Sequence, residues 1–181
     1  MGRTGRGRPA GIAAHLAAIL LIVATACGGG TPAISELLLA PADFPGQPFS
    51  RTSVDTGQTA EDQPTAITEL AAPGFSIQHS LVIYDTQESA RVALAGVRLQ
   101  LDQLARDNET TTLVRDDLAP LAIADRGLVT GVLEEVRAGN QTSSLIFVQG
   151  RILVRLTMSG TSGRELLLAY AEKARVKAAR R

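Results

Sequence analysis

A change of hydrophobic period next to Tyr84 constrains the fold more than any other feature of this sequence. From Phe75 to Tyr84 residues of one apolar face alternate with their neighbours, and this period of two predicts a half-buried β-strand. Beyond Asp85 the apolar residues instead recur every three to four positions, in one stripe: Ala90, Ala93, Leu94, Val97, Leu101 and Leu104. This stripe predicts a helix over about 86–106, which Asp85 and Glu88 open as a capping box. A strand followed at once by an amphipathic helix calls for a sheet on which that helix packs.

The second half of the chain adds further strands and a closing helix. Four stretches predict strands by their β-branched and apolar content: 110–114, 128–137, 143–149 and 151–159. The last helix begins at Ser162, which forms a capping box with Glu165, and it packs through Leu166, Leu167 and Tyr170. Runs of strands with two amphipathic helices, rather than strict alternation, predict an α+β fold in which both helices pack on an antiparallel sheet.

The region 33–74 predicts little regular structure because it holds five of the eight prolines. We expect one helical turn over Ile34–Leu39, an edge strand over Phe49–Val54 and a solvated loop over Gly57–Pro64. No long element is expected there.

The N-terminus has the layout of an export signal. Arg3, Arg6 and Arg8 precede an apolar run from Ala10 to Ala26, and this order is typical of a secretory signal peptide. The run lies at the lower limit of the roughly 20 apolar residues that cross a bilayer. An uncleaved transmembrane anchor therefore remains an alternative.

The end of this run, Ala24-Thr25-Ala26-Cys27, resembles the lipobox of bacterial lipoproteins. The resemblance implies that the Cys27 thiol takes a diacylglyceryl group before the leader is removed. Cys27 is the only cysteine, so an internal disulfide is excluded and the thiol is available for lipid. We expect a signal peptide over 1–26, the lipidated cysteine with a flexible tether over 27–33, and a single α+β domain over 34–181. The alternative is an incidental cysteine after an ordinary cleavage site.

Composition excludes two classes of partner. The leader holds three of the 18 basic residues and no acidic ones, which leaves 15 against 18 and a formal charge of −3. This balance argues against a nucleic-acid surface, which needs clustered positive charge. The chain has four Phe, two Tyr and no Trp, so it offers little material for stacking sugars or caging a quaternary ammonium.

A search for catalytic chemistry finds one candidate, His79, the sole histidine outside the leader. Ser80 follows it in a strand and must point to the opposite face, so His79 would need a distant serine to act as a base. No metal site is expected, because a lipidated Cys27 and one histidine leave no zinc spacing and the acidic residues lack the pattern of a calcium loop. No cofactor is expected either.

Two charged features have both structural and functional interpretations. Glu134 and Glu135 must face opposite sides of a strand, and pairing with Arg137, Arg151 or Arg155 would explain them; a glycosidase pair is the less favoured alternative. The C-terminal residues Lys173, Arg175, Lys177, Arg180 and Arg181 suit the end of a helix dipole, although they would also meet anionic lipid headgroups.

The order of strand, helix, strands and closing helix over about 35–178 resembles the Mog1/PsbP-like domains found in some exported lipoproteins, a likeness of architecture that implies no site residues. We expect a lipoprotein on the extracytoplasmic face of the cell membrane, anchored through Cys27, whose domain binds an unknown protein or a small apolar ligand. The sequence favours a non-enzymatic role without deciding it. An exported hydrolase with a site near His79, or a carrier of a small apolar ligand, is the alternative.

Overall fold

One seven-stranded sheet organises the domain. The computed structural model describes residues 32–115, 118, 120–123, 125–137, 139–160 and 163–179. The strands are β1 (Ser50–Gln58), β2 (Pro64–Ala72), β3 (Phe75–Ile83), β4 (Thr111–Val114), β5 (Val129–Arg137), β6 (Asn140–Gln149) and β7 (Ile152–Gly160). Their order in the sheet is β1-β2-β3-β7-β6-β5-β4, and every neighbouring pair is antiparallel.

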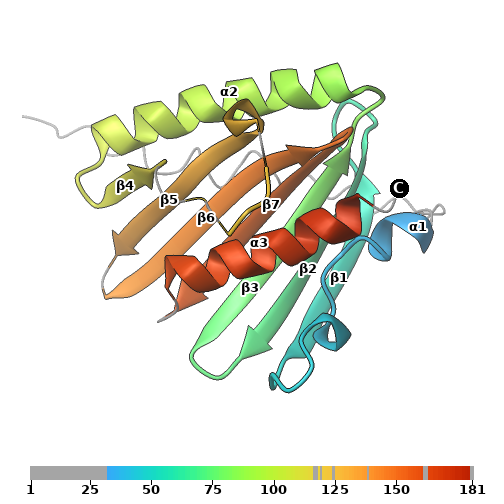
Figure 1. The fold of residues 1–181 in the computed structure, drawn as a ribbon, viewed down its shortest axis with the longest axis horizontal. Helices are drawn as coiled ribbons and strands as arrows, with labels where there is room; N and C mark the ends of the chain where they lie inside the picture. The colour runs from blue at the N-terminus through green and yellow to red at the C-terminus, as the bar shows by residue number, and fades with distance from the viewer. Residues whose placement is uncertain are drawn as a thin grey trace, which may run out of the picture.

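The two long helices cover opposite faces of this sheet. Because successive residues of a strand point to opposite faces, Leu145 and Phe147 of β6 pack with helix α3 (Arg164–Ala178), whereas Ile146 packs with helix α2 (Gln87–Asp107). Figure 1 shows α3 crossing the strands in front, with α2 along the upper side of the sheet. The predicted α+β architecture is confirmed.

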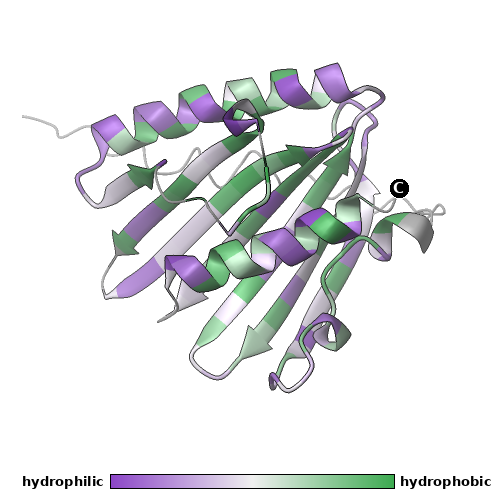
Figure 2. Cartoon of the chain, in the orientation of Figure 1, coloured by the Kyte–Doolittle hydropathy of each residue, from purple (hydrophilic) through white to green (hydrophobic). Residues whose placement is uncertain are grey.

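Hydropathy follows the same two faces. Hydrophobic and hydrophilic residues alternate along the strands and recur along both helices (Figure 2). In β7 the residues Ile152, Val154, Leu156 and Met158 are buried under α3, as the alternation predicts. The other face of β7 carries Leu153, Arg155 and Thr157, which lie on the side of α2. The core on the α3 side is therefore apolar, and the α2 side is mixed.

The helix starts differ from the expected capping boxes. The N-cap of α2 is Thr86 rather than Asp85, and its hydroxyl accepts a hydrogen bond from the Ser89 N–H at 3.0 Å. Threonine is one of the residue types preferred at an N-cap, and the observed cap lies one residue after the predicted one. The N-cap of α3 is Gly163, without a side-chain cap, and Ser162 lies outside the described residues.

The region before Phe75 is more regular than its prolines indicated. β1 and β2 are nine residues each and form a hairpin, so the expectation of no long element there is wrong. The physical reason is the placement of the prolines: Pro48 precedes β1, Pro64 is the first residue of β2, and Pro73 lies after β2. A proline at a strand end costs no ladder hydrogen bond, so it bounds the strand instead of breaking it.

A strap of residues 34–44 closes the α3 face near β2 and β3. It includes the end of the short helix α1 (Pro32–Ser35) and the whole 3₁₀ turn η2 (Pro41–Asp43), and it ends at Phe44. The side chains of Ile34, Leu38 and Leu39 are among the most buried in the protein. At its end the Phe44 ring lies 4.7 Å from the Tyr170 ring of α3, in an edge-on arrangement. The strap is therefore part of the core and not a loose extension.

A glycine bulge shapes the other side of the sheet. Gly131 of β5 has φ +90°, and the pairing of β5 with β6 shifts register between Val129 and Val132. A Cβ at Gly131 would lie 2.8 Å from the carbonyl oxygen of Val114, so a side chain is excluded on conformation and on space. The bulge lets the short strand β4 end against β5.

Candidate functional site

The lipidation site and the leader lie outside the described residues. Nothing in the structure therefore bears on Cys27, the signal peptide over 1–26 or the first part of the tether over 27–33. Within the described part of the chain, no helix is long and apolar enough to span a bilayer. The anchor remains a prediction from the sequence.

His79 is a buried structural group. It lies on the α3 face of β3 with 1% of its surface exposed, and its Nδ1 accepts a hydrogen bond from the Leu39 N–H at 3.0 Å. Burial lowers its pKa to about 3, helped by the nearby positive charge of Lys177 and opposed by Asp43. A neutral imidazole is thus fixed at ordinary pH, and it holds the strap against the sheet.

The arrangement of side chains around His79 does not support the hydrolase alternative. Ser80 faces the α2 side, as the alternation of a strand predicts, so it is separated from His79 by the sheet. Among the described residues, no serine hydroxyl or carboxylate is hydrogen-bonded to the imidazole, and Nε2 of His79 is buried without a partner. A base that exchanges its proton with a nucleophile needs such a contact and a pKa nearer the working pH.

The two adjacent glutamates divide between the faces, as expected, and Glu134 has a partner other than the arginines expected from the sequence. Glu134 faces α3, where Oε1 lies 3.9 Å from Nε of Arg164, a residue of the helix and not of a neighbouring strand. Glu135 faces the opposite side, across from Thr111 and Thr142. The two carboxylates therefore share no cleft, and the arrangement of a glycosidase pair is absent from them.

The basic residues near the C-terminus are used inside the domain. Lys177 Nζ lies 2.7 Å from Asp43 Oδ2 of the strap, and Lys173 lies over the Phe44 ring. Arg175 binds Glu172, and this hydrogen bond lowers the carboxyl pKa of Glu172 despite its partial burial. These contacts favour the structural interpretation for the three cations. Arg180 and Arg181 lie outside the described residues.

Metal-ligating side chains do not gather. In the described ranges no three His, Cys, Asp or Glu residues come close enough to hold one ion. Of the acidic residues that lie near one another in sequence, Asp102 and Asp107 are in α2, Glu109 is in the loop after it, and Asp125 is the N-cap of the 3₁₀ turn η3 (Arg126–Leu128). Asp116 and Asp117 lie outside the described residues. Asp125, for example, accepts the Gly127 N–H at 2.8 Å.

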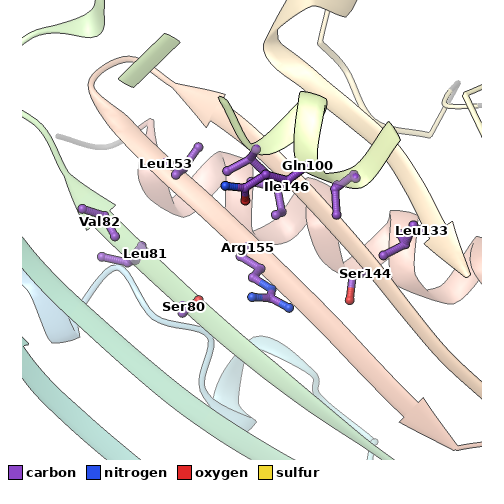
Figure 3. A pocket seen from close by; sticks show the side chains of 11 residues that line it. Ser80, Leu81, Val82, Gln100, Leu133, Ser144, Ile146, Leu153 and Arg155 are labelled. Atoms are coloured by element: carbon purple, nitrogen blue, oxygen red, sulfur yellow. The ribbon is translucent and has the colours of Figure 1, made fainter. Parts of the chain in front are cut away.

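Among the described residues, a groove lies between α2 and the sheet. It is lined mainly by apolar side chains, together with three neutral polar ones and one cation (Figure 3): Ser80, Leu81, Val82, Val97, Gln100, Leu101, Leu133, Ser144, Ile146, Leu153 and Arg155. The groove encloses a volume of about 90 Å³. This is below the 300 Å³ or more of most ligand cavities, so the groove suits a small molecule and not a long lipid.

Arg155 forms the polar floor of this groove. It lies on the central strand β7, opposite Ser80 of β3 and Ile146 of β6, and its side chain lies between Ser80 and Ser144 (Figure 3). Its Nε is buried without an acceptor, and burial lowers the guanidinium pKa from its ordinary value, although it remains charged. In the described part of the chain no carboxylate forms an ion pair with it.

The sequence pointed to Arg155 only as a partner for Glu134 or Glu135. The useful signal was Leu153, which breaks the alternation of β7 and thereby indicates cover on both faces of that strand. A charged residue two positions further on must then lie beneath the cover. Gln100 and Leu133, from elements far apart in sequence, carried no signal.

Comparison with known proteins places the fold but not the activity. No family model matches the chain, and no curated protein matches its sequence. Among solved structures, the extracellular domain of PknH from Mycobacterium tuberculosis matches with a TM-score of 0.51 and 13% identity, over 84% of this chain and 97% of that one. At this identity the likeness shows a shared fold alone. The resemblance to Mog1/PsbP-like domains stays a prediction.

Proposed function

We propose that this protein is a non-enzymatic binding domain, held on the outer side of a cell membrane by lipid on Cys27, that takes a small ligand into the groove beneath α2. The observation that carries the binding role is the groove itself, with an unpaired cation on the floor of a mostly apolar hollow. Ligand sites commonly combine an apolar lining with a few polar groups that fix orientation.

The proposed location has two independent supports. The sequence before residue 28 has an export layout that ends in a lipobox-like segment. The fold resembles a domain that works outside the cytoplasm in another bacterial protein. Two or more acyl chains are enough to hold a protein on a bilayer, since each buried methylene contributes about 0.8 kcal/mol.

The binding role is tested by filling the groove. Val97 lies on the α2 side of the groove, and Val97→Trp adds about seven non-hydrogen atoms, which is more than the hollow can hold. Leu99→Trp is the matched control, because Leu99 lies on the same helix with 71% of its surface exposed. The full chain is screened by saturation-transfer NMR against small acids, amides, alcohols and amines with short hydrocarbon tails.

We expect at least one compound to receive saturation from the wild type and from Leu99→Trp but not from Val97→Trp. A screen without binders, or binding that survives Val97→Trp, would contradict a site in the groove. The anchor is tested separately by labelling cells with a fatty-acid probe, with Cys27→Ala as the comparison. Label that persists on Cys27→Ala, or is missing from the wild type, would contradict the lipoprotein assignment.

A further inference from the structure

The described arginine and lysine side chains fall into two groups, and Arg155 belongs to neither. One group has partners: Arg164 with Glu134, Arg175 with Glu172, Lys177 with Asp43, and Arg115 with Asp102, together with Arg51, Arg98 and Arg126, which donate to backbone carbonyls. The other described arginines that lack a hydrogen-bond acceptor are exposed to water: Arg91, Arg106 and Arg151. Arg155 is largely withdrawn from water and still lacks an acceptor. A guanidinium in that position is stabilised most by an anion that comes from outside the chain.

We propose that the groove binds a short monocarboxylate, with the carboxylate on Arg155 and the hydrocarbon tail against the apolar wall under α2. This inference rests on the proposed function, because it assigns a chemical class to the ligand of the same groove.

The charge of the site favours a monoanion. Arg155 is the sole cationic side chain among the residues that line the groove, and the other polar ones, Ser80, Gln100 and Ser144, are neutral. A guanidinium presents a planar fork of N–H donors that matches the two oxygens of a carboxylate. A phosphate group carries nearly two charges at neutral pH and would leave the second one unmatched in a mostly apolar hollow.

Hydroxyl groups are placed to complete the headgroup contacts. Ser80 is the register partner of Arg155 on β3, so its hydroxyl starts from the neighbouring backbone position. Ser144 lies on the other side of Arg155, where its Oγ is 3.0 Å from Oγ1 of Thr157. Because that pair can turn either hydrogen outward, Ser144 is free to donate to an oxygen held by the arginine.

The apolar wall sets the size of the tail. Val97 and Leu101 of α2 and Leu133 of β5 line the groove together with Ile146. The hollow of about 90 Å³ is smaller than the roughly 150 Å³ cavity that binds one benzene molecule, so it takes only about three to four non-hydrogen atoms. A carboxylate uses three of them. The ligand is therefore a short acid, such as hexanoate, whose headgroup and first carbon lie in the hollow while the rest of its tail runs along the apolar wall.

The test compares an acid with its neutral counterpart on the same protein. Hexanoate and hexanamide have the same number of non-hydrogen atoms and differ in charge, and both stay in water instead of entering lipid. The full chain, isolated from its membrane into nanodiscs of neutral lipid, is titrated with each compound by saturation-transfer NMR. We expect hexanoate to bind the wild type at least tenfold more tightly than hexanamide.

Variants then locate the charge that makes the difference. Arg155→Met should weaken hexanoate binding at least tenfold and leave hexanamide binding within twofold, whereas Arg151→Met, at an exposed arginine, should change neither. Arg155→Lys keeps the charge without the fork and should fall between wild type and Arg155→Met. The melting temperature of each variant shows whether it is folded.

The outcomes separate this inference from the function on which it rests. If hexanamide or an uncharged alcohol binds as tightly as hexanoate and is lost in Val97→Trp, the groove is a binding site and the carboxylate assignment is wrong. If Arg155→Met binds hexanoate as the wild type does, the assignment to Arg155 is wrong. If no compound binds in the groove, the proposed function fails together with the inference.

Discussion

Each face of the sheet is covered by one long helix, but the two faces differ in how their polar groups are paired. On the α3 face the charged groups Lys177 and Asp43 pair with each other, and Nδ1 of His79 accepts the Leu39 N–H, although Nε2 of His79 and the Tyr170 hydroxyl are buried without a partner. On the α2 face the helix leaves a groove, and the cation on its floor has no protein acceptor. A buried charge without a partner lowers stability, and this cost on the α2 face is what the proposed ligand would offset.

The largest expected effect comes from truncating one side chain on each face of the sheet to alanine. Phe147 is fully buried under α3, and Phe147→Ala should lower the free energy of unfolding by about 3–5 kcal/mol because it leaves a cavity. Leu133 borders the groove, so water already reaches its surroundings, and Leu133→Ala should cost less, about 1–2 kcal/mol. Urea unfolding of both variants gives the two values. Equal losses would mean that the groove face is packed as tightly as the other.

The next test measures how the stability of the α3 face depends on pH. His79 has a pKa of about 3 in the fold against 6.5 when unfolded, so only the unfolded chain gains a proton between these values. Stability should be complete above pH 6.5 and fall on acidification, by up to about 1.4 kcal/mol per pH unit. His79→Asn keeps an acceptor for the Leu39 N–H and removes the titration. Urea unfolding between pH 5 and 6.5 should show the slope in the wild type and a flatter profile in the variant.

A smaller effect of opposite sign is expected in the groove. Arg155→Met replaces an unpaired, largely buried cation by an apolar chain of similar length, and should raise the free energy of unfolding by about 1 kcal/mol. Arg151→Met, at an exposed arginine, should change it by less than about 0.5 kcal/mol. Thermal unfolding without ligand checks both. A destabilised Arg155→Met would mean that the guanidinium supports the fold.

The smallest effect concerns the strap. A double-mutant cycle with Asp43→Ala and Lys177→Ala should give a coupling energy of about 0.5–1 kcal/mol, since the ion pair is only partly withdrawn from water. Raising the salt concentration should reduce this coupling. A coupling near zero would mean that the ion pair does not help to hold the strap, which would then be held by its apolar residues.

The elements that could be predicted are those in which a single hydrophobic period runs through the whole segment. The alternation from Phe75 and the stripe of α2 correctly gave β3 and α2, and the later strands were found to within a few residues. The β1–β2 hairpin was missed because a proline count says nothing of where each proline falls, and Pro64 at a strand start is harmless. The cap of α2 moved from Asp85 to Thr86, a choice that local sequence leaves open.

The candidate site could not be predicted in the same way. The groove joins β3, β5, β6 and β7 with α2, and which residues face one another depends on strand order and register. Arg155 was visible as a polar residue of β7, but its lack of a partner is a property of the assembled sheet. His79 stood out by rarity, and the structure gives it a structural role.

The strap also determines how the domain responds to tension. Its attachments follow one another along the chain: Ile34 and Leu38 in the core, Leu39 on His79, then Asp43 on Lys177. A force applied from the N-terminal side, where the proposed membrane tether lies, reaches them in that sequence and loads each in turn, whereas strands of a sheet pulled along their length share a load. The strap would therefore peel before the sheet yields, and the first mechanical event would uncover the α3 face while the groove on the opposite side stays intact.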